Sequence, residues 1–197
     1  MRRTTECTGC GLVLPVEAGA PAIPMNASPE CAAVYAEVSG FEFQHPVMLR
    51  YHQLSVDAYG AQHAGRPTTP IRLGYALAGL WLALEHGFSG DEVRVIHHSM
   101  GHAEAWWPDF EPPAGRARIT VHDVAEQGVR IGSSTGHATA TRAWAADVWG
   151  VWTAERPQVG VEVEALLRRI FVCDGRQPLR GTVGPAGAVY RLVGLLD

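Results

Sequence analysis

The chain has 197 residues, of which 47% are hydrophobic and 18% charged, so it is long enough to form one globular domain with a buried core. Its formal net charge is -4 and its arginines are scattered, with no basic run beyond Arg168–Arg169, which argues against a nucleic-acid partner. The longest apolar stretch, residues 73–84, is too short to span a bilayer, so we expect no membrane partner either.

The N-terminus and the cysteines together indicate a compartment. Polar residues follow Met1 where a secretory signal would carry an apolar segment, so we expect a cytoplasmic protein. In that reducing environment a Cys-x-x-Cys pair binds a metal or takes part in redox chemistry more often than it forms a structural disulfide.

The first segment, residues 1–30, contains the turn Cys7-Thr8-Gly9-Cys10 and then a run rich in proline, alanine and glycine, which predicts an extended loop. The triplet Ser28-Pro29-Glu30 predicts a helix start and places Cys31 in its first turn. A two-residue spacer lets one turn offer two thiolates to the same ion, and zinc takes four such ligands in a tetrahedron. We therefore expect Cys7, Cys10 and Cys31 to bind zinc, with a histidine as the fourth ligand.

The rest of the chain is patterned mainly for helices. Apolar periodicity and capping residues predict helices at residues 29–41, 47–63, 69–87, 89–100, 137–154 and 161–172, with 69–87 as the central buried helix and 119–127 as a short strand or a brief helix. The expected fold is mainly α: a single-domain helical bundle with a metal-pinned N-terminal loop. We divide it into a cysteine-containing loop segment (1–30), a helical domain (31–155) and a C-terminal extension (156–197).

Two histidines on the second predicted helix compete for the role of fourth ligand. His52 and His63 lie on the same face of that helix but about three turns, or ~16 Å, apart, so one ion cannot take both. We choose His63 for the cysteine site and keep His52 as the alternative. Asp57 lies on another face, and a solvated or capping acid is the default interpretation of it.

The remaining candidate histidines lie outside the second predicted helix. His98 and His102 have the i, i+4 spacing of metal ligands but lack the glutamate of a zinc-protease motif, so His97, His98 and His102 are interpreted as exposed. His137 opens a tryptophan-rich helix, where the helix dipole favours a neutral ring. Trp144, Trp149 and Trp152 are expected in the core, and Cys173 as a small buried hydrophobe. No nucleophile elbow, phosphate-binding loop or dinucleotide motif is present.

Several of these stretches together resemble an uncharacterised bacterial family catalogued as a domain of unknown function, DUF5946. The matching stretches are Cys7 to Gly11, Ser28 to Ala32, His52 to His63, and His137 with the Trp144, Ala145, Val148 and Trp149 that follow it. The resemblance covers residues 5–155 and implies that His52, Asp57, His63 and His137 act as a group, but it carries no activity. It does not extend to the tail beyond Pro157.

Three hypotheses follow for function. The leading one is a zinc-binding cytosolic helical protein with a structural Cys3His site and an unspecified binding or regulatory role. The rival is a metal-dependent, hydrolase-like enzyme that uses His52, Asp57 and His137, with His63, within the bundle. The third is a protein–protein module with Trp106-Trp107-Pro108 as an exposed anchor. The sequence names no small-molecule substrate, protein partner or oligomeric state.

Overall fold

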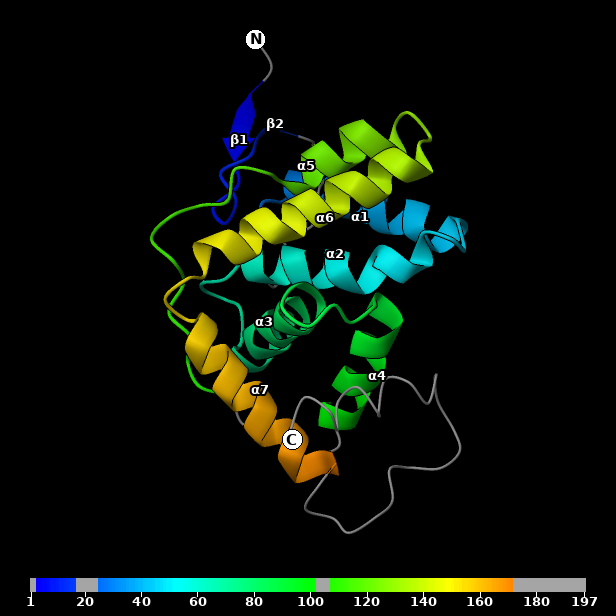
Figure 1. The fold of residues 1–197 in the computed structure, drawn as a ribbon. Helices are drawn as coiled ribbons and strands as arrows, with labels where there is room; N and C mark the ends of the chain where they lie inside the picture. Colours follow the sequence, from blue (N-terminus) through cyan, green and yellow to red (C-terminus); the bar gives the residue numbers. More distant parts are fainter. Residues whose placement is uncertain (1–2, 17–24, 102–106, 172–197) are drawn as a thin grey trace.

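The computed structural model describes residues 3–16, 25–101 and 107–171. These residues form a mainly α-helical fold, as predicted, with two short strands at the N-terminal end (Figure 1). The helices are α1 (Pro29–Gln44), α2 (Leu49–Gln62), α3 (Pro70–Leu84), α4 (Gly90–Gly101), α5 (Val121–Val124), the π-helical turn η1 (Ala125–Val129), α6 (Ser134–Val151) and α7 (Arg156–Phe171).

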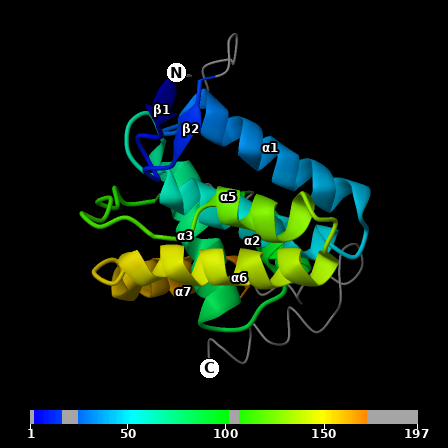
Figure 2. The same ribbon diagram turned by 90° about the horizontal axis from the view of Figure 1, so that it is seen from above.

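Helix α2 lies in the middle of the bundle. It contacts α1, α3, α4 and α6, and Figure 1 shows it between α6 above and α3 below. In the view from above, α1 and α6 lie on either side of α5 (Figure 2). Helix α3, predicted to be the central buried helix, contacts α2, α4, α6 and α7 and buries Leu73, Leu77, Leu80 and Leu82. The two helices therefore share the central position of the bundle.

Side-chain caps explain where the helices begin. Such a cap satisfies a backbone N–H that has no partner inside the helix. The first turns of α1, α4, α5 and α6 are capped by Ser28, Ser89, Thr120 and Ser133. Residues 119–127, left open between a strand and a helix, form the helical pair α5 and η1. Helices α1 and α4 begin within one residue of their predicted starts, and α6, predicted over 137–154, is capped by Ser133 and begins at Ser134.

The N-terminal segment departs from the predicted loop. It forms an antiparallel hairpin of β1 (Thr4–Glu6) and β2 (Val13–Pro15), with Thr5 opposite Leu14. The Cys-x-x-Cys turn is the tip of this hairpin. Helix α7 also differs from its prediction, because it begins at Arg156, five residues earlier than expected.

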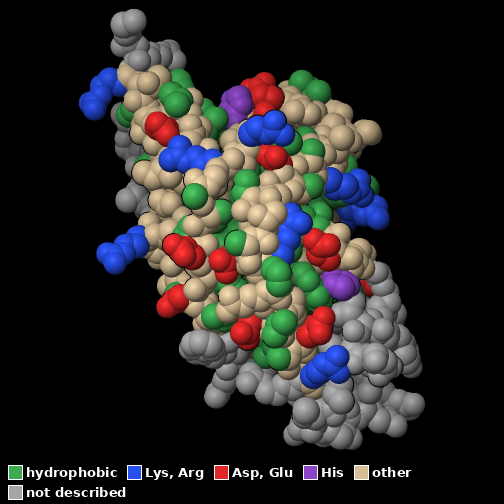
Figure 3. Space-filling model, turned by 60° about the vertical axis from the view of Figure 1, so that its left-hand side comes forward, with side chains coloured by type: hydrophobic (Ala, Val, Ile, Leu, Met, Phe, Trp, Pro, Cys, Tyr) green, Lys and Arg blue, Asp and Glu red, His purple; other side chains and the backbone are tan. Residues whose placement is uncertain are grey.

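The core is built from apolar side chains of nearly all helices. Trp144, Trp149 and Trp152 are buried, as predicted. Helix α7 packs against α3 and α4 and buries Val163 and Leu167, so the described part of the expected C-terminal extension belongs to the bundle. No helix among the described residues has the length and apolar character to cross a bilayer. On the face drawn in Figure 3, acidic, basic and hydrophobic side chains are interspersed.

Candidate metal centre and a second polar cluster

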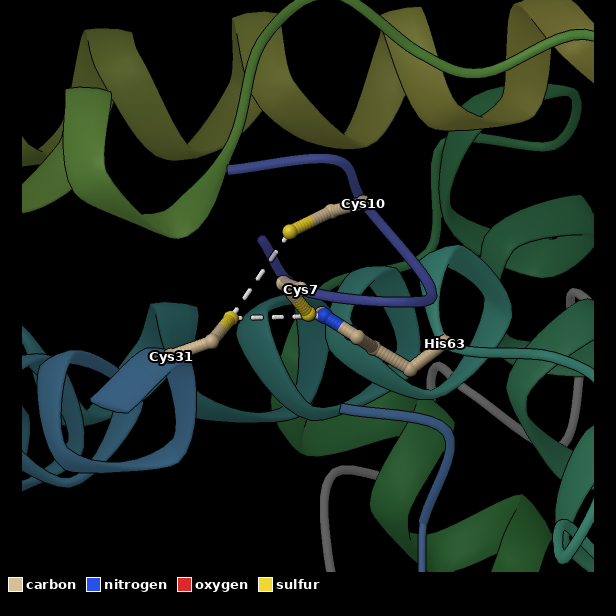
Figure 4. A group of neighbouring side chains, drawn as sticks. All are labelled: Cys7, Cys10, Cys31 and His63. Atoms are coloured by element: carbon tan, nitrogen blue, oxygen red, sulfur yellow. Dashed lines mark hydrogen bonds between the residues drawn. The ribbon is translucent and has the colours of Figure 1, made fainter. Parts of the chain in front are cut away.

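Four predicted ligands meet between the hairpin and the bundle. Cys7 and Cys10 come from the hairpin tip, Cys31 from the first turn of α1, and His63 from the residue that ends α2 (Figure 4). One donor atom from each lies within 4.8 Å of the others. All four residues are buried, and none is more than 5% exposed. The three cysteines are free thiols, so the cluster could bind a metal ion.

The spacing of the donors fits a tetrahedral ion of the size of zinc. The Sγ atoms of Cys10 and Cys31 lie 3.7 Å apart, and Sγ of Cys31 lies 3.4 Å from Nε2 of His63. A zinc ion with bonds of about 2.3 Å to sulfur and about 2.0 Å to nitrogen separates two sulfurs by about 3.8 Å, and a sulfur from a nitrogen by about 3.5 Å. The separations of Cys31 from Cys10 and from His63 therefore match those that this ion requires.

Neighbouring groups hold the four ligands in place. Nδ1 of His63 lies 2.8 Å from the carbonyl oxygen of Tyr59, which leaves Nε2 to face the sulfurs. The backbone N–H of Ser28 donates to Sγ of Cys7 at 3.3 Å, and the Tyr59 hydroxyl lies 3.8 Å from Sγ of Cys31. The bond at Nδ1 fixes the tautomer and the orientation of His63, and the two bonds to sulfur orient the side chains of Cys7 and Cys31. Such supporting hydrogen bonds are typical of metal sites.

The hairpin tip requires close backbone packing. The turn is closed by the N–H of Gly11 donating to the carbonyl of Cys7 at 2.8 Å, and Gly11 has a φ of 79°, which favours glycine. A methyl group on Gly9 would lie 2.3 Å from the carbonyl oxygen of Asn26 and 2.6 Å from Cδ2 of His63. The Cys-x-x-Cys spacer therefore contains a glycine where the turn touches the fourth ligand.

Without a metal, the four donors share protons unequally. Hydrogen bonding to Cys10 and Cys31 lowers the pKa of Cys7, whereas hydrogen bonding to Cys10 and Cys7 raises the pKa of Cys31. Burial lowers the pKa of His63, but hydrogen bonds and electrostatic attraction to Cys10 and Cys7 outweigh it and raise that pKa to about 9. A bound cation would replace these protons, which is how thiolate and imidazole sites take up metal.

His52, the alternative fourth ligand, lies elsewhere. At the other end of α2 it joins a second cluster, the Glu42 cluster, formed by Glu42, His52, Ser55 and His137. Oε2 of Glu42 lies 2.8 Å from Nδ1 of His52, and Oε1 lies 3.0 Å from Nε2 of His137. The Ser55 hydroxyl donates to Oε1 at 2.5 Å. The structure thus brings His52 and His137 together, as the sequence analysis suggested, but on a carboxylate that it had not identified.

Glu42 is completely buried and nevertheless favours its ionised form. Burial raises the pKa of Glu42, but hydrogen bonds with His137, His52 and Ser55 outweigh that effect and hold the pKa below its ordinary value. His137 lies in the first turn of α6. The carboxylate therefore lies near the positive end of the α6 dipole, which favours a negative charge.

A signal for Glu42 exists in the sequence. Glu42 follows Val38 by four residues and Phe41 by one, so it falls on the apolar stripe of α1 that also carries Val34. An acidic residue on a buried stripe requires partners of its own. His52 and His137 are those partners.

Asp57 is in neither cluster and is not the solvated acid that we expected. It is 2% exposed and packs against α3, where a methyl group on Gly79 would lie 2.0 Å from its Oδ2. Nε2 of Gln53 donates to its Oδ1 at 2.9 Å, and Oδ2 has no partner among the described residues. Burial raises the pKa of Asp57 well above its usual range, against the effect of Gln53. The interpretation as a surface acid is therefore wrong.

The remaining histidine predictions have mixed outcomes. His98 is exposed, as expected, whereas His97 is only partly exposed. Nδ1 of His97 lies 3.3 Å from Nε2 of Gln53, and burial lowers its pKa to about 4. His97 is therefore neutral at physiological pH rather than a solvated ring. His102 lies outside the described residues.

Two further predictions concern the proposed surface anchor, Trp106-Trp107-Pro108, and the last cysteine, Cys173. Trp107 is 4% exposed, and its ring packs directly on Gly74 of α3. It therefore belongs to the core, which removes half of the proposed tryptophan anchor. Trp106 and Cys173 lie outside the described residues.

The fold and the cluster define a helical protein with a buried Cys3His set of potential metal ligands. The chain belongs to a family of unknown function, DUF5946, whose model matches residues 5–153. No curated protein and no solved structure gives a significant match to it. The function is therefore inferred from the two clusters themselves.

Proposed function

We propose that the protein binds one zinc ion through Cys7, Cys10, Cys31 and His63, and that this metal is structural. The observation that carries the proposal is the convergence of four buried donors from three separate segments, with one donor atom of each within 4.8 Å of the others. Three thiolates and one imidazole are a soft donor set that suits zinc and disfavours magnesium or calcium.

The closure of the site supports a structural role. Four protein donors complete a tetrahedral zinc shell, whereas a catalytic zinc keeps one position for water or substrate. The hairpin has three-residue strands, and a two-stranded sheet of that size is marginal by itself. Coordination therefore fastens the hairpin to the start of α1 and the end of α2, and stabilises the N-terminal third of the fold.

The location and the cellular role belong to the same proposal. A cytoplasmic location keeps thiols reduced and available as ligands. Because the metal site is closed, the protein acts through binding or regulation rather than through chemistry at the zinc.

The rival metal-dependent enzyme is less well supported, since Asp57 lies apart from His52 and His137. Among the described residues, Cys3His is the one set of three or more donors close enough for an ion.

The experiment is a measurement of metal content by elemental mass spectrometry on purified full-length protein. We expect one zinc per chain in the wild type and in two control variants, Cys173→Ser and His122→Asn. We expect less than a tenth of that content in Cys31→Ser and His63→Ala. Full zinc content in Cys31→Ser, or loss of zinc in the controls alone, would overturn the assignment.

A further inference from the structure

We propose that Glu42 and His52 form a general-base pair that acts at the protein surface without a metal, on carboxylic esters with an apolar acyl group. This inference goes beyond the structural zinc site, because it concerns the opposite end of α2. It rests on the orientation of one imidazole ring, on the carboxylate behind it and on the apolar side chains around it.

The first step is the orientation of His52. Its Nδ1 is held by Oε2 of Glu42 at 2.8 Å, and this bond to an ionised carboxylate places the ring proton on Nδ1. The lone pair of Nε2 then points away from Glu42. The side chain is 22% exposed, and Nε2 makes no hydrogen bond within the described residues. A histidine oriented by a buried carboxylate, with its other nitrogen free, is the arrangement of a general base.

The second step is the support behind the carboxylate. His137 and Ser55 both bond to Oε1 of Glu42, so Oε2 is left to His52. Gly128 of η1 packs directly on His137, where an added methyl group would lie 2.5 Å from its Cα. The π-helical turn therefore fixes His137, and His137 in turn fixes Glu42. These are positioning residues for His52.

The third step is the contrast with other histidines of the described chain. His45 is held at Nδ1 by the backbone carbonyl of Phe41, not by a carboxylate. His63 turns its Nε2 into the cysteine cluster, and that of His97 is buried. His52 thus combines a carboxylate at one nitrogen with solvent access at the other.

The apolar rim indicates the substrate class. The Phe43 ring is 63% exposed and packs against the His52 ring at a centroid distance of 4.4 Å. Val56, 37% exposed, lies one helical turn after His52 on the same face of α2. These two exposed apolar side chains offer a surface beside the imidazole on which an apolar group loses contact with water. An apolar acyl chain would pack on Phe43 and Val56 while its carbonyl carbon lies near Nε2.

The reaction follows from these groups. Nε2 of His52 takes a proton from a water molecule as the water oxygen attacks the ester carbonyl carbon. The bond from that carbon to the alcohol oxygen then breaks, and the imidazolium returns the proton to the departing alkoxide. The net change is ester plus water to carboxylic acid plus alcohol, with His52 restored. Glu42 stabilises the transient imidazolium and keeps its own charge throughout.

The test uses zinc-loaded full-length protein and p-nitrophenyl butyrate as the probe. We expect hydrolysis above the buffer rate, reduced at least tenfold in kcat by His52→Gln and about tenfold or more by Glu42→Gln. Phe43→Ala should raise KM for the butyrate with little change in kcat. His122→Gln, which alters an imidazole elsewhere on the surface, should match the wild type.

A spectroscopic measurement separates positioning from a loss of fold. In ¹⁵N-labelled protein, we expect His52 to show the Nδ1–H tautomer, and Glu42→Gln to change that signature while zinc content and circular dichroism stay at wild-type levels. Hydrolysis equal in wild type and His52→Gln, or an Nε2–H tautomer for His52 in the wild type, would overturn the proposal. Either result leaves the zinc assignment untouched, since zinc content is measured separately.

Discussion

The two ends of α2 carry the same side chain in two different environments. At the C-terminal end of α2, His63 is held at Nδ1 by a backbone carbonyl and turns Nε2 towards three sulfurs. Near its start, His52 is held at Nδ1 by a buried carboxylate and turns Nε2 towards solvent. The partner of the second nitrogen decides the chemistry: soft donors around Nε2 make a metal site, whereas a free Nε2 backed by a carboxylate makes a proton acceptor.

The largest expected difference between the two ends is in stability. We predict that His63→Ala loses zinc and lowers the free energy of unfolding by about 4 kcal/mol or more, because loss of a structural metal is among the most costly single changes. His52→Ala should keep its zinc and lose much less. Urea denaturation of both variants, with zinc content measured in parallel, checks this. Equal losses in the two variants would remove the distinction between the ends.

The Glu42 cluster should also be sensitive to loss of its central charge. Glu42→Ala leaves two histidines and a serine without their acceptor in a buried site, so we predict a cost of about 3 kcal/mol in the free energy of unfolding. Glu37, whose carboxylate pairs with Arg130 at the surface, provides the control. Glu37→Ala should cost about 1 kcal/mol or less. If the two substitutions cost the same, Glu42 does not organise its cluster.

A third prediction concerns pH and contrasts Glu42 with Asp57. The pKa of Asp57 is raised in the folded state, so its contribution to stability is greatest below its ordinary value of 3.8 and is lost as the pH rises towards the folded pKa. The pKa of Glu42 is lowered, so its contribution is present above 4.5 and is lost as the pH falls through the folded pKa.

Asp57→Asn should therefore gain stability relative to the wild type as the pH rises, by about 1.4 kcal/mol for each pH unit within that window. Glu42→Gln should lose relative stability only as the pH rises from the folded pKa of Glu42 to about 4.5, and above that its stability relative to the wild type should not depend on pH. Urea denaturation from pH 5.5 to 8, with both variants compared with wild type at equal zinc content, should therefore show a rising relative stability for Asp57→Asn and a flat one for Glu42→Gln. Parallel slopes for the two variants would contradict the assigned directions.

The smallest predicted effect lies in the backbone of the hairpin tip. Gly9→Ala forces a methyl group against the carbonyl of Asn26 and the ring of His63, so we predict weaker zinc binding and a loss of about 1 kcal/mol or more in stability. Gly40 of α1 is the matched control, because an added methyl group there meets nothing within 4 Å. Gly40→Ala should stabilise the protein by about 0.5 kcal/mol and leave zinc affinity unchanged. Thermal unfolding and a competition titration with a zinc chelator would measure both.

The sequence predicts much of the helical framework and the ligand set for local reasons. Ser28, Ser89 and Ser133 cap helices through bonds to residues three positions away, so the pattern is visible without a fold. The two-residue spacing of Cys7 and Cys10 is likewise a short-range pattern that can be recognised without knowledge of the fold. The limited reach of one ion allows only one of His52 and His63 to join the cysteines, and which of them does so depends on how α2 packs.

What the sequence did not predict depends on contacts between distant segments. The hairpin strands are three residues long, too short for a visible alternation, and their pairing follows from the turn between them. Glu42 meets His137 across 95 residues of chain. The burial of Asp57 depends on Gly79, which lets α3 approach closely enough to cover the carboxyl group. The apolar stripe of α1 marks Glu42 as a buried acid, but no periodic signal identifies the distant partners in these three contacts.

The most direct test of the central claim is X-ray absorption spectroscopy at the zinc edge on the purified, zinc-loaded protein. A closed Cys3His site predicts three sulfur neighbours at about 2.3 Å and one nitrogen at about 2.0 Å, with no change on adding small anions. A first shell that contains water or carboxylate oxygen, or one that changes when azide is added, would contradict a structural role and place an open metal site in this protein.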